Sequence, residues 1–360
     1  MNARDLNVNI NEKLRLALEK ARFFCERFKK NGYECYVVGG AVRDALIGKT
    51  IYDIDLTTSA LPDETARIFS DCKLDLRGMK YGSVAVYFCD ERYEITTFRK
   101  ESGYYDRRRP SEIEFCSDVK TDLTRRDFTC NALAFGFSIG LIDCFGGIND
   151  VKNKVLRTVG NPLTRLEEDS LRILRALRFY SVLGFTPDKQ LKNAIYSRRE
   201  YIKTLPKERV YEELKKTIIG ESFCECFTCN YAVFSVILPE LFAPVLSNSS
   251  KNVIKAYAEK ICIPLKLLNR SSFEERFAAL FYETAKIDES AAKNALISFK
   301  AGKKTIKAVE NYIKSYLKDN KLENKSEFKD EKIYLTKPEE EFKDIVKNIM
   351  NVNIKIDSLE

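Results

Sequence analysis

Tyr36-Val-Val-Gly-Gly-Ala-Val-Arg-Asp44 is a stretch that predicts a buried strand running through two glycines into the first turn of a helix. Glycines at such a junction let the backbone approach a ligand closely, and the free amides of a helix N-terminus favour an anion such as phosphate. Arg43 strengthens this interpretation. A cation in the first helical turn opposes the helix dipole, so its presence there needs another reason, such as an anionic ligand. For the glycine pair alone, the alternative is a tight turn without a ligand.

Two aspartates follow in a second predicted strand, Ile51 to Thr58. The two-residue period of a strand places Asp53 and Asp55 on one face, where they repel each other unless they share a cation. Paired carboxylates suit Mg²⁺, which takes one or two of them together with substrate phosphates. Glu94 lies in another predicted strand and is a candidate third carboxylate, although its contact with a metal stays open. The alternative is a solvated turn before a helix at Pro62.

The composition restricts the chemistry. With 360 residues the chain has room for two or three domains, and it contains no histidine. The absence of histidine excludes Ser-His-Asp and Cys-His triads, histidine acid–base catalysis, His-ligated zinc and a His-Asp phosphohydrolase site within these residues. Any catalysis by these residues must therefore rely on carboxylates, cations, hydroxyls, thiols or a bound metal.

Charge and hydrophobic periodicity change along the chain. Residues 1–150 carry 23 Lys and Arg against 24 Asp and Glu, whereas the other 210 residues carry 38 against 29. The first part predicts a helix near Glu12 to Lys30 and several short strands, and after about Pro162 the pattern is helical nearly to the end. The predicted strands are Glu34 to Val38, Ile54 to Thr58, Ser83 to Phe88 and Tyr93 to Phe98. We therefore predict an α/β head followed by a basic, all-helical body that suits a partner carrying phosphates.

Eleven scattered cysteines favour reduced thiols in a cytoplasmic protein. The cluster Cys224, Cys226 and Cys229 has the alternatives of three zinc ligands or ordinary buried thiols in a helix. The first 30 residues lack the apolar core of a signal peptide, and the apolar stretch Tyr231 to Leu246 is too short to span a bilayer. We expect no membrane association.

Four ordered motifs resemble those of the class II tRNA nucleotidyltransferase and bacterial poly(A) polymerase family. The motifs are Gly39-Gly-Ala-Val-Arg-Asp44, Asp53-Ile-Asp-Leu-Thr-Thr-Ser-Ala-Leu-Pro62, Arg125-Arg-Asp-Phe-Thr-Cys-Asn-Ala132 and Glu168-Asp-Ser-Leu-Arg172. The resemblance extends from about Tyr33 to Glu212. It implies an α+β fold, in which a nucleotidyltransferase (polymerase-β-like) head with a mixed sheet precedes a helical neck, body and tail.

The resemblance also implies roles for residues of the head. Asp53 and Asp55 would hold Mg²⁺, and Gly40, Arg43 and Arg126 would bind the nucleotide triphosphate and sugar. The implied reaction is in-line attack of an RNA 3′-hydroxyl on the α-phosphate with release of pyrophosphate. Metal ions stabilise both the entering and the leaving oxygen in such a transfer, so no histidine base is needed.

A stripe of polar residues is predicted on one helix and resembles the family's nucleobase pocket; it comprises Asp169, Arg172, Arg175 and Arg178. Cytosine and adenine both present an amine donor beside a ring-nitrogen acceptor, whereas uracil and guanine present a carbonyl beside a ring N–H. Asp169 accepts and Arg172 donates, so this pair matches C and A and mismatches U and G. The alternative is a solvated basic face.

The resemblance leads to expected domains and partners. We expect an N-terminal helical segment over 1–32, a head over 33–160, a neck over 161–220 and an RNA-binding body and tail over 221–360. The segment Arg99 to Pro110 is expected to form a mobile cationic loop. The substrates would be CTP, ATP and the tRNA 3′ end, with no stable protein partner implied. Poly(A) synthesis, addition of C only or A only, and non-catalytic RNA binding stay open as alternatives.

Overall fold

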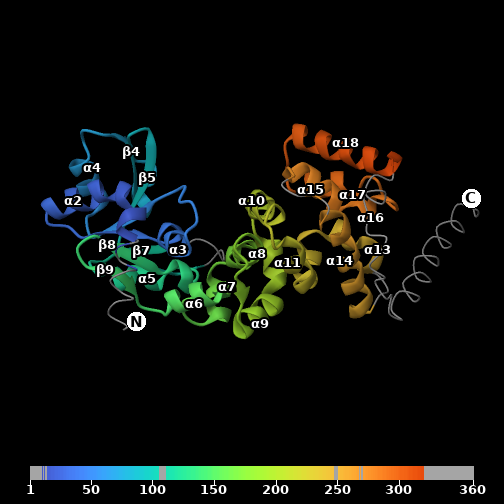
Figure 1. The fold of residues 1–360 in the computed structure, drawn as a ribbon, viewed down its shortest axis with the longest axis horizontal. Helices are drawn as coiled ribbons and strands as arrows, with labels where there is room; N and C mark the ends of the chain where they lie inside the picture. The colour runs from blue at the N-terminus through green and yellow to red at the C-terminus, as the bar shows by residue number, and fades with distance from the viewer. Residues whose placement is uncertain are drawn as a thin grey trace, which may run out of the picture. The chain divides into compact units, whose positions relative to one another are not determined.

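The computed structural model describes residues 10, 12, 14–104, 111–246, 250–266, 268 and 271–319. The chain divides into two compact units, drawn in Figure 1. Unit 1 comprises Met1–Phe179 and Phe185–Arg198, and unit 2 comprises Tyr180–Gly184 and Arg199–Glu360. The domain boundaries at residues 32, 160 and 220 stay predictions.

Unit 1 contains a seven-stranded sheet in the order β3-β4-β5-β2-β1-β8-β9. β2 and β5 pair in parallel, and the other neighbouring pairs are antiparallel, so the sheet is mixed. The strands are β1 (Cys35–Val38), β2 (Asp55–Thr58), β3 (Lys73–Asp75), β4 (Ser83–Phe88), β5 (Glu91–Thr97), β8 (Leu133–Gly136) and β9 (Gly140–Asp143). The four predicted strands are all present, which confirms the α+β prediction for the head.

The central strand β1 positions the site. All four of its residues are buried, and it lies between β2 and β8. Because β1 and β2 are antiparallel, the end of β1 lies beside the start of β2, with Val38 opposite Asp55. The N–H of Gly39 then donates to the carbonyl of Leu133 at 3.1 Å, which ties the next turn to the start of β8.

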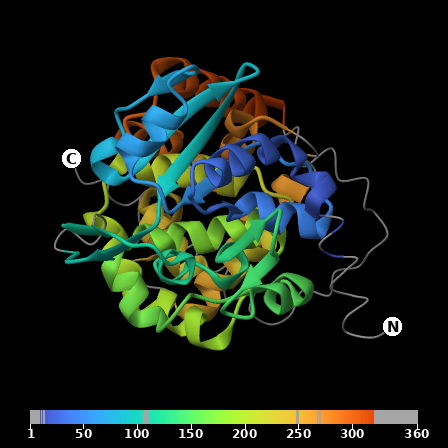
Figure 2. The same ribbon diagram turned by 90° about the vertical axis from the view of Figure 1, so that its left-hand side faces the viewer.

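Helices α2 (Arg22–Lys30), α3 (Gly40–Ile47) and α4 (Pro62–Ile68) pack on strands of this sheet, and further helices complete unit 1, which faces the viewer in Figure 2. The further helices are η1 (Glu19–Ala21), η2 (Met79–Tyr81), α5 (Val119–Thr124), η3 (Thr129–Asn131), α6 (Gly147–Asn153), α7 (Pro162–Glu168), α8 (Leu171–Leu183, in unit 1 up to Phe179) and α9 (Lys189–Arg198). Aromatic packing fixes α2, since Phe24 lies 4.5 Å from Tyr93 and 5.5 Å from Phe69 between ring centroids. The single helix predicted near Glu12 to Lys30 is instead interrupted by η1, where Leu18 leaves helical backbone angles.

Two small strand pairs complete unit 1. β6 (Arg99–Ser102) pairs with β7 (Glu112–Phe115) as a hairpin, and β10 (Val155–Leu156) pairs in parallel with β11 (Thr186–Pro187). The first residues of the predicted cationic loop therefore form strand β6 of this hairpin. Residues 105–110, which hold its consecutive arginines, lie outside the described residues.

Unit 2 is helical throughout its described residues, as predicted. Its helices are η4 (Arg199–Thr204), α10 (Lys207–Ile218), α11 (Phe223–Cys229), α12 (Tyr231–Ile237), α13 (Pro239–Leu246), α14 (Lys251–Lys266), α15 (Phe273–Leu280), α16 (Tyr282–Ala285), α17 (Ala291–Ser298) and α18 (Lys303–Asp319). Phe227 packs in its core at 4.9 Å from Phe234 and 5.8 Å from Phe242 between ring centroids. None of the helices in the described part of the chain has the length and apolar character needed to cross a membrane.

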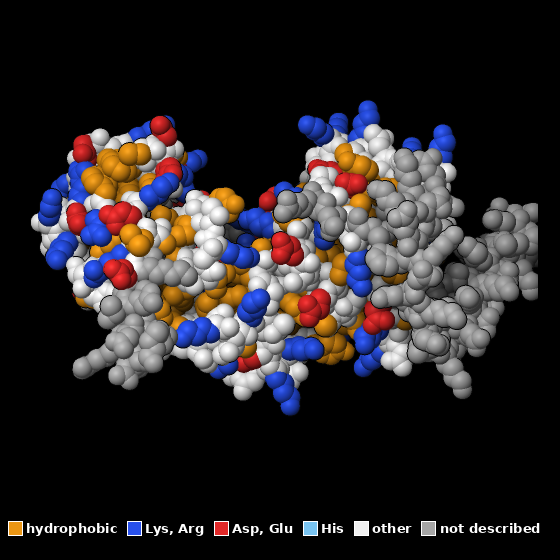
Figure 3. All heavy atoms as spheres, viewed as in Figure 1, with side chains coloured by type: hydrophobic (Ala, Val, Ile, Leu, Met, Phe, Trp, Pro, Cys, Tyr) orange, Lys and Arg blue, Asp and Glu red, His pale blue; other side chains and the backbone are white. Residues whose placement is uncertain are grey.

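Exposed lysines line helix α18 of unit 2. Figure 3 shows Lys and Arg side chains standing out along this side of the unit. The lysines are Lys303, Lys304, Lys307, Lys314 and Lys318. Most of them recur at three to four positions and so lie on one side of the helix.

Candidate active site

The turn after β1 has a backbone conformation that only glycine adopts readily. Gly39 has φ +71° and ψ −131°, and α3 starts at the next residue, Gly40. A Cβ at position 39 would lie 3.4 Å from Nη1 of Arg126. The turn therefore brings bare backbone against an arginine, and binding of a phosphate at this junction stays a prediction.

Three carboxylates gather beside this turn. Asp55 is the first residue of β2 and is in register with Glu94 on the parallel strand β5. Asp53 precedes the strand instead of sharing it, so the predicted two-residue strand spacing is wrong for this pair. Burial, followed by the charges of Glu94 and Asp53, raises the pKa of Asp55 against the opposing effects of Arg126 and Arg92.

This crowding indicates a place for a cation. Two like charges beside Asp55 disfavour its ionised form, and a divalent ion shared among the oxygens would relieve that cost. Glu94 is paired with Arg92 at 3.1 Å, which offsets part of its negative charge. Within the described residues no three acidic or thiol side chains are arranged as a ready metal site. Oxygens of a substrate would therefore have to complete the coordination of an ion held by Asp53 and Asp55.

Arg126 contains a polar atom that no group among the described residues satisfies. Its Nη2 donates to Asp122 at 3.1 Å, whereas its Nε is buried without a hydrogen-bond partner. Asp122 is fully buried and also accepts from Nε of Arg125 at 2.9 Å. Burial would raise the pKa of Asp122, but Arg125 and Arg126 outweigh it and hold the pKa below its ordinary value. The ionised aspartate thus fixes Arg126 beside Gly39 and within electrostatic reach of Asp55.

Arg43 is buried and bonded inside the head. Its Nη1 donates to Oδ1 of Asn131 at 2.5 Å, its Nε donates to Asp44 at 2.9 Å, and its guanidinium lies 5.3 Å from the ring centroid of Phe179. A Cβ at Gly40 would come within 3.5 Å of this guanidinium. Arg43 consequently connects the glycine turn to α8, in addition to any contact that it makes with a nucleotide.

Asp169 lies outside the helix on which it was predicted. It has extended backbone angles after α7, and its Oδ1 accepts from the N–H of Leu171 at 3.0 Å. An aspartate in this position caps the following helix, here α8, which explains the break. Burial raises the pKa of Asp169, whereas Arg172 and Arg175 oppose that shift.

The three predicted arginines of α8 have different surroundings. Arg172 is buried, and its Nη1 donates to the carbonyl of Arg165 at 2.6 Å and to Glu168 at 3.1 Å. Arg175 contacts Asp127 through two hydrogen bonds. The guanidinium of Arg178 lies 4.8 Å from the ring centroid of Phe179.

The structure thus brings together Asp55, Glu94 and Arg126 at one end of the sheet, and Asp169 with Arg172 and Arg175 at the start of α8. The segment Arg125-Arg126-Asp127 connects the two groups. The carbonyl of Arg126 accepts from Arg165 at 2.9 Å, and the carboxylate of Asp127 pairs with Arg175 on α8. Sequence reasoning missed Asp122 and Asp127 as the acids that hold these arginines. Asp127 lies within a motif that was recognised, and its position directly after two arginines was the available signal.

The cysteine cluster in α11 forms no zinc site within the described residues. Cys226 is buried, Cys229 is exposed, and Cys224 faces Cys262 on α14. The zinc alternative is therefore wrong for this cluster, because its thiols point to different surroundings.

Comparisons with known proteins show which family the chain resembles. Residues 35–157 match the family model described as the poly A polymerase head domain, and residues 184–243 match the probable RNA and SrmB-binding site of polymerase A. The chain is 44% identical over 209 residues to a CCA-adding enzyme of Staphylococcus epidermidis and 42% identical over 208 residues to that of Lactobacillus helveticus. Each match covers 58% of this chain and 52% of the relative, so the chain matches about half the length of these curated relatives.

Solved structures extend the match over more of the chain. The CCA-adding enzyme of Bacillus stearothermophilus in complex with CTP is 30% identical, with a TM-score of 0.67 over 84% of this chain and 70% of that one. The Thermotoga maritima CCA-adding enzyme complexed with tRNA is 22% identical with a TM-score of 0.63 over 86% and 72%, a likeness of fold. Since the head matches the family model and the chain covers 70% of a 30% identical CCA-adding enzyme, the chain belongs to the family of class II tRNA nucleotidyltransferases (CCA-adding enzymes) and bacterial poly(A) polymerases.

Proposed function

We propose that this protein adds or repairs the 3′-terminal CCA of tRNA, using CTP and ATP and releasing pyrophosphate. The observation that carries the proposal is the buried Nε of Arg126, which has no hydrogen-bond partner among the described residues, on a guanidinium whose Nη1 lies next to the Cβ position of Gly39. A buried donor without a partner costs about 1–3 kcal/mol, so its retention favours an anionic ligand such as a triphosphate. The names of the relatives supply the choice of RNA and nucleotides.

Asp53 and Asp55 are proposed to hold Mg²⁺. When bound, this ion would lower the pKa of an RNA 3′-hydroxyl and stabilise charge on the entering and leaving oxygens. The crowded carboxylate of Asp55 fits this role, since a cation would restore its ionised form. Glu94 would add negative charge from the next strand without being a required ligand.

The triphosphate is proposed to lie between the glycine turn and Arg126. Gly39 and Gly40 present backbone without side chains at the start of α3, where amide groups and the helix dipole favour an anion. Arg126 would direct Nε toward a phosphate oxygen while Asp122 keeps the guanidinium in place. Arg43 would keep the turn rigid through Asn131 and Asp44.

Base selection is proposed for Asp169 and Arg172. An ionised Asp169 accepts the exocyclic amine that cytosine and adenine share, and Arg172 donates to their ring nitrogen. Because Arg172 donates to Glu168 in this structure, engaging a base would require it to exchange or share that contact. Arg175, held by Asp127, would fix the spacing of the pair. Arg178 is proposed to line the same pocket next to Phe179.

RNA is proposed to bind through the helical part. The exposed lysines of α18 offer positive charge at regular intervals, and contacts to phosphates give affinity that falls steeply with salt. We also propose a cytoplasmic location, which is supported by the free thiols and by the nature of the substrates.

The test is incorporation of each labelled nucleotide into tRNA that lacks its 3′ end, with Mg²⁺ present. We expect incorporation of C, and of A once C is present, with little U or G. Arg126→Lys should raise the KM for CTP about tenfold or more, because lysine keeps the charge and loses the guanidinium geometry. Arg77→Lys is the matched control, since Arg77 is an exposed arginine on the same unit.

Two results would contradict the proposal. Incorporation of A alone into many unrelated RNAs would favour a poly(A) polymerase, the activity in the name of the matched head model. No incorporation of any nucleotide would leave RNA binding without catalysis.

A further inference from the structure

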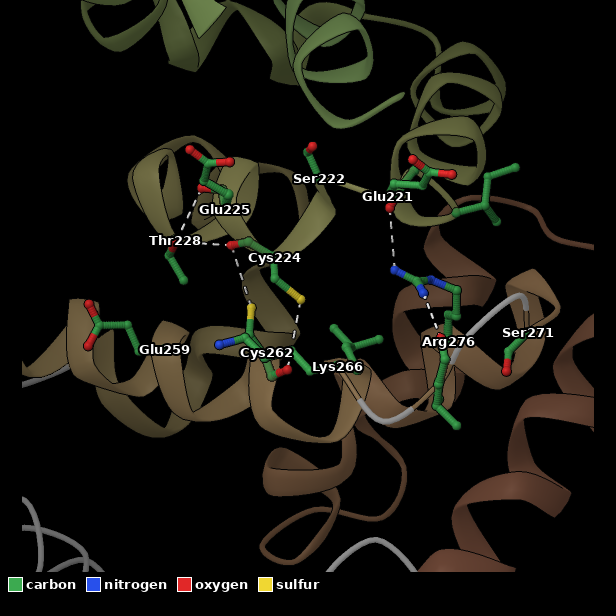
Figure 4. Close-up of a pocket in the computed structure, with 14 residues that line it drawn as sticks. Glu221, Ser222, Cys224, Glu225, Thr228, Glu259, Cys262, Lys266, Ser271 and Arg276 are labelled. Carbon is green, nitrogen blue, oxygen red and sulfur yellow. Dashed lines mark hydrogen bonds between the residues drawn. The ribbon is translucent and has the colours of Figure 1, made fainter. Parts of the chain in front are cut away.

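Unit 2 contains a large cavity that the proposed reaction does not use. It has a volume of about 940 Å³ and is lined by residues of α11, α14 and α15 together with the segment before α11 (Figure 4). Two of the eleven cysteines line it, Cys224 from α11 and Cys262 from α14. Cys224 is partly exposed in this cavity, whereas Cys262 is buried.

The two cysteines are in reciprocal contact. The Sγ of Cys224 donates to the carbonyl of Cys262 at 3.8 Å, and the Sγ of Cys262 donates to the carbonyl of Cys224 at 3.8 Å. Each side chain therefore reaches across to the backbone of the facing helix. Figure 4 shows both sulfur atoms in the gap between α11 and α14.

A buried positive charge lies at the same cavity. Arg276 on α15 is 9% exposed and donates to the carbonyls of Ile218 at 2.7 Å and Leu268 at 3.1 Å. No carboxylate among the described residues pairs with it, so its charge acts on the thiols. Arginine remains charged when buried, and a cation close to a cysteine favours the thiolate.

The surrounding charges make the two cysteines unequal. Contact with Cys262, followed by Arg276 and Lys266, lowers the pKa of Cys224 against the effect of burial. Contact with Cys224, burial and the charge of Glu259 instead raise the pKa of Cys262. The other acids of the cavity, Glu221 and Glu225, are exposed to solvent, where water screens their charge.

We propose that Cys224 and Cys262 are a modification site, a dithiol that hydroperoxides oxidise to a disulfide. The thiolate of Cys224 attacks the terminal peroxide oxygen, the O–O bond breaks, and Cys224 becomes a sulfenic acid while water or an alcohol leaves with one proton. The thiol of Cys262 then attacks the Cys224 sulfur, forming the S–S bond and releasing water. One hydroperoxide is reduced by two electrons for each disulfide formed, and a partly exposed thiolate beside a second cysteine suits this sequence.

The disulfide would join α11 to α14 across the cavity. A second close pair provides a comparison, because Cys25 and Cys35 have their sulfur atoms 3.6 Å apart. Both of those cysteines are buried, and burial raises the pKa of Cys35. In both pairs the two cysteines lie close together. Of these four cysteines, Cys224 is the one that is partly exposed to solvent and has a cation nearby.

The test uses the reduced full chain treated with hydrogen peroxide, followed by alkylation, digestion without reduction and mass spectrometry. We expect a Cys224–Cys262 linked peptide to form at least about tenfold faster than any Cys25–Cys35 linkage, consistent with thiolate-controlled reactivity. Cys262→Ser should leave a sulfenic acid on Cys224 that dimedone traps. Cys229→Ser is the matched control on the same helix and should leave the linkage unchanged.

Other outcomes would overturn the proposal. If peroxide oxidises the exposed Cys89 and Cys229 while Cys224 remains available to alkylation, Cys224 has no special reactivity. If Cys262→Ser gives no dimedone adduct at Cys224, Cys224 is not the attacking thiol. Equal rates for the two cysteine pairs would show that the cavity and its cation have no effect.

Discussion

Arg175 holds the carboxylate of Asp127 through two hydrogen bonds, from Nε at 2.7 Å and from Nη2 at 2.5 Å. Asp127 also accepts from the N–H of Phe128 at 2.8 Å. This pair joins the arginine motif of the head to helix α8, where the proposed base-selecting residues lie. It therefore links the proposed triphosphate end of the site to the proposed nucleobase end.

Asp127→Asn should remove a pH-dependent part of the stability. Burial opposes ionisation, but Arg175 and the other hydrogen bonds outweigh it and lower the pKa of Asp127 from 3.8 to about 2. A depressed pKa stabilises the fold above the unfolded-state pKa, and this contribution disappears as the pH falls from about 4 to about 2. Its size is roughly 2 kcal/mol.

Urea unfolding followed at several pH values measures this contribution. The wild type should lose stability over the acid range more steeply than Asp127→Asn, and the variant should be less stable at pH 7. Parallel pH profiles for the two proteins would show that the Asp127–Arg175 pair does not couple ionisation to folding.

Asp55→Asn should lower nucleotide incorporation by about a hundredfold or more, because an amide no longer attracts the metal that the proposed transfer requires. Binding of tRNA should change little, since the lysines of α18 are in the other unit. Steady-state incorporation and a filter-binding titration separate these two effects. Asp90→Asn is the matched control, because Asp90 lies in an exposed turn with φ +61°, which asparagine tolerates. Normal turnover by Asp55→Asn would refute its assignment as a metal ligand.

Asp169→Asn should relax the choice among nucleotides, since an amide both donates and accepts. Burial raises the pKa of Asp169, so its ionised form declines at a higher pH than that of an ordinary aspartate. The ratio of kcat/KM for CTP to that for UTP should therefore fall as the wild type is acidified from neutral pH. For Asp169→Asn, the same ratio should be low and independent of pH. Full preference for CTP in the variant would exclude Asp169 from base selection.

Gly39→Ala should combine backbone strain with loss of nucleotide binding. Its positive φ disfavours alanine by roughly 1–3 kcal/mol, and the new methyl group would occupy the space next to Nη1 of Arg126, where the triphosphate is proposed to bind. Gly32→Ala is the matched control, because Gly32 has φ +84° with open space around its Cβ position. Thermal unfolding should show a loss in both variants, whereas the KM for CTP should rise only in Gly39→Ala. A similar KM effect in both would assign the change to strain alone.

The sequence predicted the centre of the sheet better than its edges. β1 and β4 were recognisable because Cys35–Val38 and Ser83–Phe88 are apolar runs flanked by turn residues. β3 was missed since Lys73–Asp75 is short and polar, and its pairing with β4 depends on contacts distant in sequence. β9 follows β8 through a tight connection at Gly140, which has φ +86°.

The acids that support the site show the same limit. Asp53, Asp55 and Arg126 became candidates because they lie in ordered motifs, whereas Asp122 stands alone in an ordinary helical sequence. Its role depends on burial and on contacts with Arg125, Arg126 and Thr57 that only the folded chain brings about. The break at Asp169 was missed because Asp169 and the arginines that follow it recur at three residues, as on a continuous helix.

The most direct test of the proposed function is to sequence the 3′ ends of the products. Purified protein, tRNA lacking its terminal CCA and all four nucleoside triphosphates would be incubated together with Mg²⁺. The proposed mechanism predicts products that end in CCA and are not extended further. Long runs of A, ends of mixed sequence, or unextended tRNA would contradict it.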